Sequence, residues 1–467
     1  MIASDLKNKK IYFFRLSKIS IELIKYFNAN EINFAILFDK YFDTTLKEYC
    51  INNGLATNQQ FCDIDIFDYN KADYIILTEG TFSTETQIDD KIKNLFTNIK
   101  DKIVLEAEFV SLLFPDKIII GVIGESYKHF IDNYLHSICN NANKSMISDI
   151  SEVNKNFNIE KDDILLTFLT KDKIKFLKTL LFDFLIVLEL QDFIEDKTDT
   201  EEEYIIGKQD AKTKIIVNID NGYIKELYDS NLFQQKLNFV GDLVPISINK
   251  KINNGFSFVN GTIYNYFDQE NESYDLPQNE FNSGNIRSMS ILSCFIVSKY
   301  IIQDAKTAID TIKNISNIKN CLEAIYENEN IRLISNLNII NKNMFLEAFK
   351  VYNSNNILIC VINNKDKCNI ALKEYTDCFK EVYFIDIFNM LRIEESKKIR
   401  SFKFDNFDNF MATFSKNIAE NLQNSNEIIN VIVSVYDIIK IQDAKKYNSY
   451  VENIKQIIIG VKNENFK

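Results

Sequence analysis

The sequence predicts an α/β protein of three domains, in which short buried strands alternate with amphipathic helices. Short apolar runs recur along the chain, and segments with helical apolar spacing follow them. This alternation, which is typical of parallel sheets covered by helices, occurs in three blocks at residues 1–95, 96–316 and 317–467. The length of 467 residues also exceeds one compact domain. We therefore expect a Rossmann-like first domain, a central α/β domain and a second Rossmann-like domain at the carboxyl end.

The first block opens with a strand, a helix and a second strand. The strands are expected at 11–14 and 34–38, with a helix over 19–27 between them. Asp39 follows the second strand, where an acidic side chain often binds a ribose hydroxyl. The usual glycine fingerprint is missing, because the first turn reads Arg15-Leu16-Ser17-Lys18. A further strand at 73–77 ends at Thr78-Glu79-Gly80-Thr81.

The second block contains the strongest buried strand, at 118–123, followed by a turn and an amphipathic helix over 130–138. The dipeptide Asn260-Gly261 between two apolar runs predicts a β-hairpin with strands at 256–259 and 262–264. Other strands are expected at 164–169, 184–190 and 214–219, and a helix at 286–302.

The third block alternates again, which predicts a second nucleotide-fold-like unit. Its strands are expected at 357–362, 382–385 and 428–434, with helices at 370–379 and 410–422.

Charge and composition exclude several classes of protein. The formal net charge of −12 argues against a nucleic-acid binder, which needs a basic excess. No stretch approaches the roughly 20 apolar residues that cross a bilayer, so we expect a cytoplasmic protein without a membrane segment. Eleven glycines and three prolines are few for this length, so glycine motifs are expected to be eroded. With two histidines and no CxxC pair, the eight cysteines are expected to be buried thiols.

The turn after strand 118–123 has the shape of a phosphate-binding loop. It reads Gly121-Val122-Ile123-Gly124-Glu125-Ser126-Tyr127-Lys128-His129-Phe130. Such a loop presents free N–H groups at a helix start and one lysine to the phosphates. Tyr127 stands where a glycine precedes the lysine, and His129 stands where a magnesium-binding hydroxyl follows it. An ordinary strand-to-helix turn is the alternative interpretation of these residues alone.

The chain resembles the Mur ligase family over its whole length, in the order of three domains. The resemblance implies that the central sheet is of the phosphate-loop ATPase type. The family loop G-[IV]-T-G-T-N-G-K-T-T aligns without gaps to residues 121–130. Further matches are Leu105 to Phe109, Thr78 to Thr81, Tyr204 to Lys208, Val217 to Asn221, Gly284 to Ser288, Asn320 to Glu323, Ser335 to Asn341 and Asn363 to Lys367.

The resemblance implies the following sites. Catalytic residues would be Lys128 and Lys208, the second as a carbamylated ligand of Mg²⁺. ATP would contact Gly121, Gly124, Glu125, Ser126, Lys128 and Asn285. The UDP part of the substrate would contact Asp39, Thr78 and Gly80. For Lys208 a plain surface lysine is an equal alternative, for Glu108 a helix-start residue, and for Asn285 a helix N-cap.

The sequence departs from the family pattern at several positions. The family's metal-binding glutamate corresponds to Thr167, and its D-H-L-D histidine has no counterpart in Asp192 to Glu195. Its substrate-binding lysine corresponds to Asn338, and the arginine of H-R-F-E to Cys321.

Two functions follow from the resemblance. One is an ATP-dependent amide-bond ligase that adds D-glutamate to UDP-N-acetylmuramoyl-L-alanine through an acyl phosphate, with ATP and Mg²⁺ as cofactors and a monomeric chain that binds no nucleic acid and no membrane. The other is a catalytically degenerate binding or scaffold protein on the same three domains. A folate-type glutamate ligase is a weaker alternative, because its first domain differs.

Overall fold

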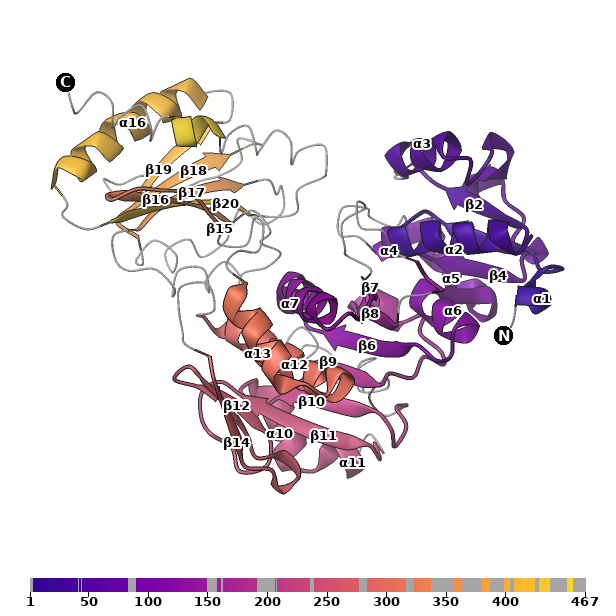
Figure 1. Cartoon of the computed structure of the whole chain (residues 1–467). Coiled ribbons are helices and arrows are strands. Elements are labelled where there is room, and N and C mark those ends of the chain that lie inside the picture. Colours follow the sequence, from indigo (N-terminus) through magenta and orange to yellow (C-terminus); the bar gives the residue numbers. More distant parts are fainter. Residues whose placement is uncertain are drawn as a thin grey trace. The chain divides into compact units, whose positions relative to one another are not determined.

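The structure is a computed structural model, and its elements form three separate sheets (Figure 1). The residues that it describes are 3–40, 42, 44–82, 90–148, 158–160, 163–190, 206, 208–235, 239–276, 284–315, 323–336, 356–362, 379–386, 399–403, 407–424, 428–436 and 452–456. The chain divides into two compact units, one of residues 1–277 and 289–314, the other of residues 278–288 and 315–467. The first unit holds two of the three sheets.

The first sheet has five parallel strands in the order β3-β2-β1-β4-β5. Buried isoleucines, leucines and phenylalanines fill every strand except the edge strand β3, because helices cover a parallel sheet on both faces. The strands are β1 (Ile11–Phe14), β2 (Phe34–Phe38), β3 (Phe61–Asp63), β4 (Tyr74–Leu77) and β5 (Ile103–Leu105). The helices are α1 (Ala3–Leu6), α2 (Lys18–Ala29), α3 (Thr44–Asn52), α4 (Glu79–Phe82), α5 (Asp90–Asn98) and α6 (Glu106–Leu113).

The second sheet has nine strands in the order β14-β13-β12-β11-β10-β9-β6-β8-β7. Strands from β7 to β12 across the sheet are parallel, and β12, β13 and β14 are antiparallel. The strands are β6 (Ile118–Ile123), β7 (Met146–Ser148), β8 (Ile164–Phe168), β9 (Phe184–Val187), β10 (Lys214–Asn218), β11 (Asp242–Ser247), β12 (Phe256–Val259), β13 (Thr262–Asn265) and β14 (Glu272–Asp275). The helices are α7 (Lys128–Asn141), α8 (Lys171–Ile174), α10 (Gly222–Asp229), α11 (Leu232–Gln235), α12 (Asn285–Ile302) and α13 (Ala305–Asn314).

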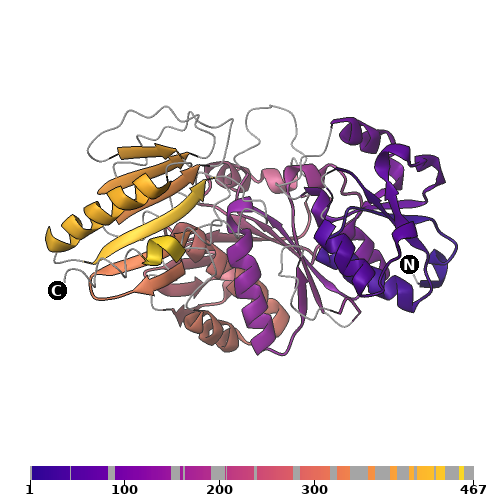
Figure 2. The same ribbon diagram turned by 90° about the horizontal axis from the view of Figure 1, so that it is seen from above.

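The third sheet has six strands in the order β15-β16-β20-β17-β18-β19, and only β15 runs antiparallel. Its one described long helix, α16 (Phe407–Asn424), lies along the sheet in both views (Figures 1 and 2). Phe410, Phe414 and Ile418 of this helix are fully buried in the core. The strands are β15 (Glu323–Glu327), β16 (Ile331–Asn336), β17 (Asn356–Ile362), β18 (Glu381–Asp386), β19 (Ile399–Lys403) and β20 (Ile429–Tyr436).

The predicted fold class is confirmed, since each of the three blocks forms an α/β sheet. The strand predicted at 118–123 is β6, and it lies inside its sheet between β8 and β9. The hairpin is also present: Asn260 and Gly261 have φ values of 51° and 78°, as its tight turn requires. Residues 370–378 of the helix expected at 370–379 lie outside the described residues.

The first sheet extends further along the chain than the boundary predicted at residue 95. Strand β5 pairs with β4, so residues 103–105 belong to the first sheet. Strand β5 was not predicted because three residues are too few to show the pattern of a buried strand. The second unit resumes at Ile315, next to the boundary predicted between residues 316 and 317.

Candidate functional site

The predicted phosphate-binding loop lies at the carboxyl-end edge of the second sheet. Strand β6 has parallel neighbours on both sides, so β6, β8 and β9 all end at this edge. Ligands of open α/β sheets bind at such an edge. After β6 the chain passes through Gly124 and a 3₁₀ turn (Glu125–Tyr127), and α7 begins at Lys128. The turn therefore leads directly into the amino end of a long helix, where free N–H groups favour an anion.

The two glycines of this loop are explained by different packing. Gly124 has a φ of 143°, which an L side chain rarely adopts, and a Cβ there would lie 3.1 Å from the Tyr127 ring. Gly121 lies within β6, where a Cβ would lie 2.8 Å from the ring of Phe182. Gly124 thus shapes the loop, whereas Gly121 makes room for the core.

Lys128 and His129 form the first turn of α7, and both are half-buried. Burial is the main cause that lowers the pKa of His129 to about 4, and the charge of Lys128 is a smaller cause in the same direction. His129 is therefore neutral near pH 7, and Lys128 brings the positive charge at this helix start. The side chain of Glu125 lies outside what the structure describes.

An acidic residue that we did not predict, Glu189, contacts the loop. It follows β9, the strand beside β6, and its carboxylate accepts a 2.9 Å hydrogen bond from the hydroxyl of Ser126. Ser126 is buried and Glu189 is half-buried. Hydroxyl and carboxylate oxygens are the ligands that Mg²⁺ prefers. A glutamate two residues after a buried apolar strand was the available indication, but the sequence alone does not place that strand next to β6.

In the first sheet, Asp39 forms a buried ion pair with Arg15. The Arg15 Nε and Nη2 atoms donate to the two carboxylate oxygens at 3.1 Å and 2.7 Å. The two side chains are only 2% and 5% exposed. The Asp39 carboxylate, predicted to hold a ribose, is thus engaged by a side chain of the turn that lacks the glycine fingerprint.

Thr78 and Gly80 lie at the same edge of the first sheet. The hydroxyls of Thr78 and Thr81 both donate to the carbonyl oxygen of Phe14, at 3.1 Å. Gly80 lies in the short helix α4. The structure therefore brings Asp39, Thr78 and Gly80 to one edge, where the first two are held by other groups of the domain.

A pocket lies within the first unit, where the carboxyl ends of strands from both sheets meet. Its polar lining comes from Glu79, Glu106, Thr167 and Lys173, and the rest of its lining is apolar. Lys173 is 4% exposed, pairs with the Glu79 carboxylate and donates to the carbonyl oxygen of Phe168 at 2.7 Å. Lys173 was not predicted from the sequence, because nothing in its local pattern marks a buried lysine.

Lys208 lies at the opposite edge of the second sheet from Lys128. Its Nζ donates to the carbonyl oxygen of Lys178 at 3.2 Å. Residues 208–213 precede β10 and pair with residues that precede β9, for example Phe182 with Gln209 at 3.0 Å. These residues lie before the strands begin, whereas Lys128 follows the end of β6. The structure does not bring the two predicted catalytic lysines together.

Glu108 and Asp220 both accept hydrogen bonds from other segments of the chain. Glu108 is 1% exposed, and its Oε1 accepts from the amide and the hydroxyl of Thr179, at 2.6 Å and 2.7 Å. It therefore joins α6 to the segment before β9. Asp220 accepts from the Ser247 hydroxyl and the Ile248 amide, both at 2.7 Å. Both contacts hold backbone segments in place.

Other predicted residues are not placed relative to the loop. Asn285 begins α12, is exposed, and belongs to the second unit. Several positions compared with the family pattern lie outside the described residues. They are the departures at Asp192 to Glu195, Cys321 and Asn338 and the matches at Tyr204, Gly207 and Asn363 to Lys367.

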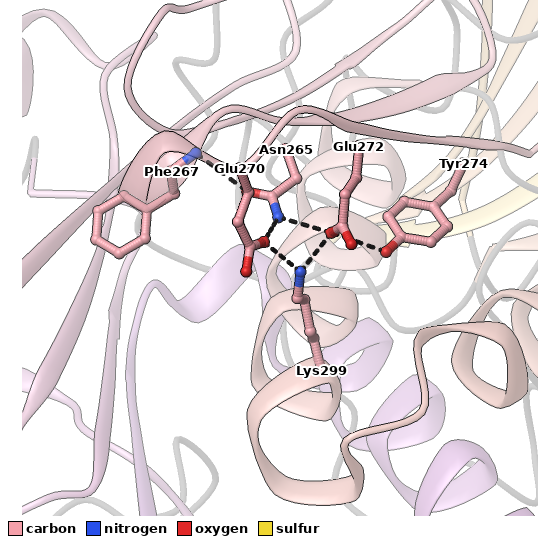
Figure 3. Close-up of polar contacts among 6 residues, drawn as sticks. All are labelled: Asn265, Phe267, Glu270, Glu272, Tyr274 and Lys299. Atoms are coloured by element: carbon pink, nitrogen blue, oxygen red, sulfur yellow. Dashed lines mark hydrogen bonds and ion pairs between the residues drawn. The ribbon is translucent and has the colours of Figure 1, made fainter.

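A second charged cluster, at the antiparallel edge of the second sheet, is explained by structural contacts (Figure 3). Lys299 of α12 pairs with both Glu270 and Glu272, while Asn265 and Tyr274 donate to Glu272 at 3.0 Å and 2.9 Å. The hydrogen bond from Lys299 is the main cause that lowers the pKa of Glu272 to about 2. The cluster ties β13 and β14 to α12.

Two further findings concern metals and membranes. In the part of the chain that the structure describes, no three His, Cys, Asp or Glu side chains are grouped so that they could hold a metal ion. Among the same residues, no helix combines the length and apolarity needed to span a bilayer.

Comparisons with known proteins support the fold. No protein-family model and no curated protein matches the sequence. Among solved structures, UDP-N-acetylmuramate-alanine ligase from Thermotoga maritima matches with a TM-score of 0.57 and 13% identity, over 96% of this chain and 100% of that one. A pseudomurein peptide ligase type C from Methanothermus fervidus matches with a TM-score of 0.54 and 11% identity, over 97% and 100%. The MurF ligase from Thermotoga maritima, solved in complex with ADP, matches with a TM-score of 0.50 and 13% identity, over 93% and 95%. At these identities the likeness shows that the chain has the three-domain fold of these ligases.

Proposed function

We propose that this protein is an ATP-dependent amide-bond ligase of the Mur type, acting on a UDP-linked sugar acid. The observation that carries the proposal is the loop from Gly124 to Lys128, which leads into α7 at the carboxyl edge of the central sheet. The whole-length likeness in fold to three such ligases supports it.

The reaction proceeds in two steps. A substrate carboxylate oxygen attacks the γ-phosphorus of ATP, which forms an acyl phosphate and releases ADP. The amine of an amino acid then attacks the acyl carbon, which forms the amide, releases phosphate and loses a proton. Both steps concentrate negative charge on phosphoryl oxygens, so positioning and cations supply most of the catalysis.

The chain's own residues assist at defined positions. The amino end of α7 and the Lys128 ammonium would hold the β- and γ-phosphates. His129, with its pKa lowered to about 4 by burial, adds no charge near pH 7. The backbone conformation of Gly124 lets the chain turn from β6 into this helix.

Mg²⁺ is the expected second cofactor, and the donor set near the loop fits it. Ser126 and Glu189 offer a hydroxyl and a carboxylate beside the helix start, and Mg²⁺ is commonly held by one or two such groups together with phosphates and waters. Bound there, the ion would neutralise charge on the phosphates. The predicted role of Lys208 as a carbamylated metal ligand stays a prediction, and its position at the other edge of the sheet does not support it.

The acceptor predicted from the sequence is D-glutamate, added to UDP-N-acetylmuramoyl-L-alanine. The solved structures of similar fold include an enzyme named for alanine instead. We therefore test two pairs: UDP-N-acetylmuramoyl-L-alanine with D-glutamate, and UDP-N-acetylmuramate with L-alanine. The amide product, identified by mass spectrometry, decides between them.

The deciding experiment measures phosphate release from Mg-ATP with each pair. We expect turnover with one pair, and its loss in the Lys128→Ala variant. Lys208→Ala is the matched lysine control, because Lys208 lies at the opposite edge and should leave turnover unchanged. No turnover of the wild-type chain with either pair contradicts the ligase proposal, and loss in Lys208→Ala would support the carbamylated-ligand role.

The second candidate function is a binding or scaffold protein without ligase activity. The buried Arg15–Asp39 pair favours it, because it engages the acidic residue expected to hold a ribose. In this case, calorimetry should detect nucleotide binding while the assay above detects no amide product.

A further inference from the structure

The pocket in the first unit combines a buried lysine that follows a strand of the second sheet with two glutamates that follow strands of the first sheet. Lys173, on α8 after β8, comes from the second sheet. Glu79 and Glu106 follow β4 and β5 of the first sheet. All three line the pocket together with Thr167 and Leu169, and the remaining lining is apolar. All of the residues that line this pocket belong to the first compact unit.

Lys173 needs an anion where it lies. Its side chain is 6% exposed, so its ammonium has lost most of its water. A buried charge of this kind is unfavourable unless it is paired and hydrogen-bonded. The carbonyl oxygen of Phe168, at 2.7 Å, accepts one of its hydrogen bonds, and Glu79 supplies the negative charge.

Glu106 contacts the backbone of Glu79, whose side chain pairs with Lys173. The Ser17 hydroxyl lies 2.7 Å and 2.8 Å from the two oxygens of Glu106. The backbone amide of Glu79 also donates to Glu106, at 3.2 Å. Glu106 thus holds the backbone of Glu79 in place, while the side chain of Glu79, which is 17% exposed, pairs with Lys173.

The pocket adjoins the strand that carries the phosphate-binding loop. Strand β8, whose end lines the pocket, pairs with β6, and the Leu169 amide donates to the Val122 carbonyl oxygen at 2.8 Å. Neighbouring strands lie about 4.8 Å apart. A carboxylate bound at Lys173 would therefore lie near the carboxyl end of β8, the strand beside β6, whose own carboxyl end leads into the loop that would hold ATP.

We propose that Lys173 binds the carboxylate of the acyl substrate, and that Glu79 is an internal competitor which occupies Lys173 until the substrate displaces it. This inference rests on the proposed function, since it assigns the carboxylate-binding residue of that same site. Exchange of one carboxylate for another keeps the lysine paired throughout, so it avoids the cost of an unpaired buried charge.

The competing explanation is that Lys173 and Glu79 only fasten the two sheets to each other. The two explanations differ in the effect that they predict for Glu79→Gln. A fastening pair predicts that Glu79→Gln weakens the fold and leaves ligand preference unchanged. A competitor predicts that Glu79→Gln strengthens the binding of ligands that carry a carboxylate, and of those alone.

The experiment compares two probes by calorimetry. UDP-N-acetylmuramate carries a lactyl carboxylate, and UDP-N-acetylglucosamine has the same nucleotide and amino sugar without it. The measured quantity is the ratio of their dissociation constants for the full-length wild type, Glu79→Gln, Lys173→Met and the double variant. Lys214→Met is the matched control, because Lys214 pairs with Asp242 at a distant strand start.

We expect Glu79→Gln to raise the preference for the carboxylate probe by about 10-fold. A change of this size lies within the usual range of coupling between two binding events. Lys173→Met should favour the probe without a carboxylate, because Glu79 remains and repels the other one. The double variant should bind both probes equally, and Lys214→Met should match the wild type. The double variant removes both members of the ion pair, so it reports even if Lys173→Met fails to fold.

An unchanged ratio in Glu79→Gln, or a retained preference in the double variant, overturns this inference while the ligase proposal stands. Absence of binding of both probes to the wild type overturns the ligase proposal as well, and with it this inference.

Discussion

The first and second sheets use the same kind of edge in different ways. In both, parallel strands end together, at the position where α/β proteins bind ligands. At the first edge Arg15 is paired with Asp39, and the Thr78 hydroxyl is bonded to the end of β1. At the second edge a glycine with a φ of 143° turns the chain into a long helix that starts with a lysine. The first edge is stabilised by its own side chains, whereas the second retains the shape of an anion site.

This difference shows that topology alone does not define a binding site. The first turn has an arginine with a φ of 61° where nucleotide-binding folds have glycine. The arginine side chain reaches the end of β2 and neutralises the acid there. The second turn keeps one structurally required glycine, and the carboxylate beside it, Glu189, contacts the buried Ser126 in the loop itself.

The largest expected effect is at the second edge. Lys128→Met removes the one positive charge at the start of α7, so we expect the rate of ATP-dependent phosphate release to fall about 1,000-fold. Thermal unfolding should be unchanged, because a half-buried lysine at a helix start contributes little stability. Turnover near the wild-type rate would mean that this edge does not hold the phosphates.

The first edge should respond in stability. Arg15→Met leaves the Asp39 carboxylate buried without its partner, so the free energy of unfolding should fall by about 3–5 kcal/mol. Denaturation in urea, followed by circular dichroism, measures this. The double variant Arg15→Met/Asp39→Leu should recover most of the loss. A fall below about 1 kcal/mol for the single variant would show that the pair is not structural.

The pH dependence of stability should contain a contribution from His129. Its folded pKa of about 4 lies below the ordinary value of 6.5, so the unfolded chain takes up a proton first as pH falls. Its contribution is complete above pH 6.5 and is lost between about pH 6.5 and 4, by up to about 3 kcal/mol. The melting temperature of His129→Asn should therefore fall less than that of the wild type between pH 7.5 and 4.5. Parallel curves would mean that the ring is solvated.

The smallest expected effect concerns the packing beneath the loop. Gly121→Ala places a methyl group 2.8 Å from the Phe182 ring, which should cost about 1–3 kcal/mol of unfolding free energy. Gly222→Ala is the matched control, because no atom lies within 4 Å of its added Cβ and it should change stability by less than about 1 kcal/mol. Equal melting temperatures for the two variants would show that Phe182 moves aside without cost.

Local patterns in the sequence determined much of the fold. Continuous apolar runs such as Ile118 to Ile123 favour buried strands, and Asn260-Gly261 between two apolar runs favours a tight hairpin turn. Strand β5 was missed because it has three residues, and β11 because Pro245 within it argues against a strand. The candidate loop from Gly121 to Lys128 was predictable for the same reason, since its residues are contiguous in the chain.

Only the tertiary structure decided which side chains meet at that loop and beside it. Ser126 and Glu189 are 63 positions apart, and they touch because β9 lies next to β6. Glu79 and Lys173 come from different sheets, and Lys208 lies at the far edge because its segment precedes β10. Periodicity reports which face of an element is buried, but it contains no information on which strands are neighbours. The order of strands, set by packing between distant segments, therefore decides the composition of the site.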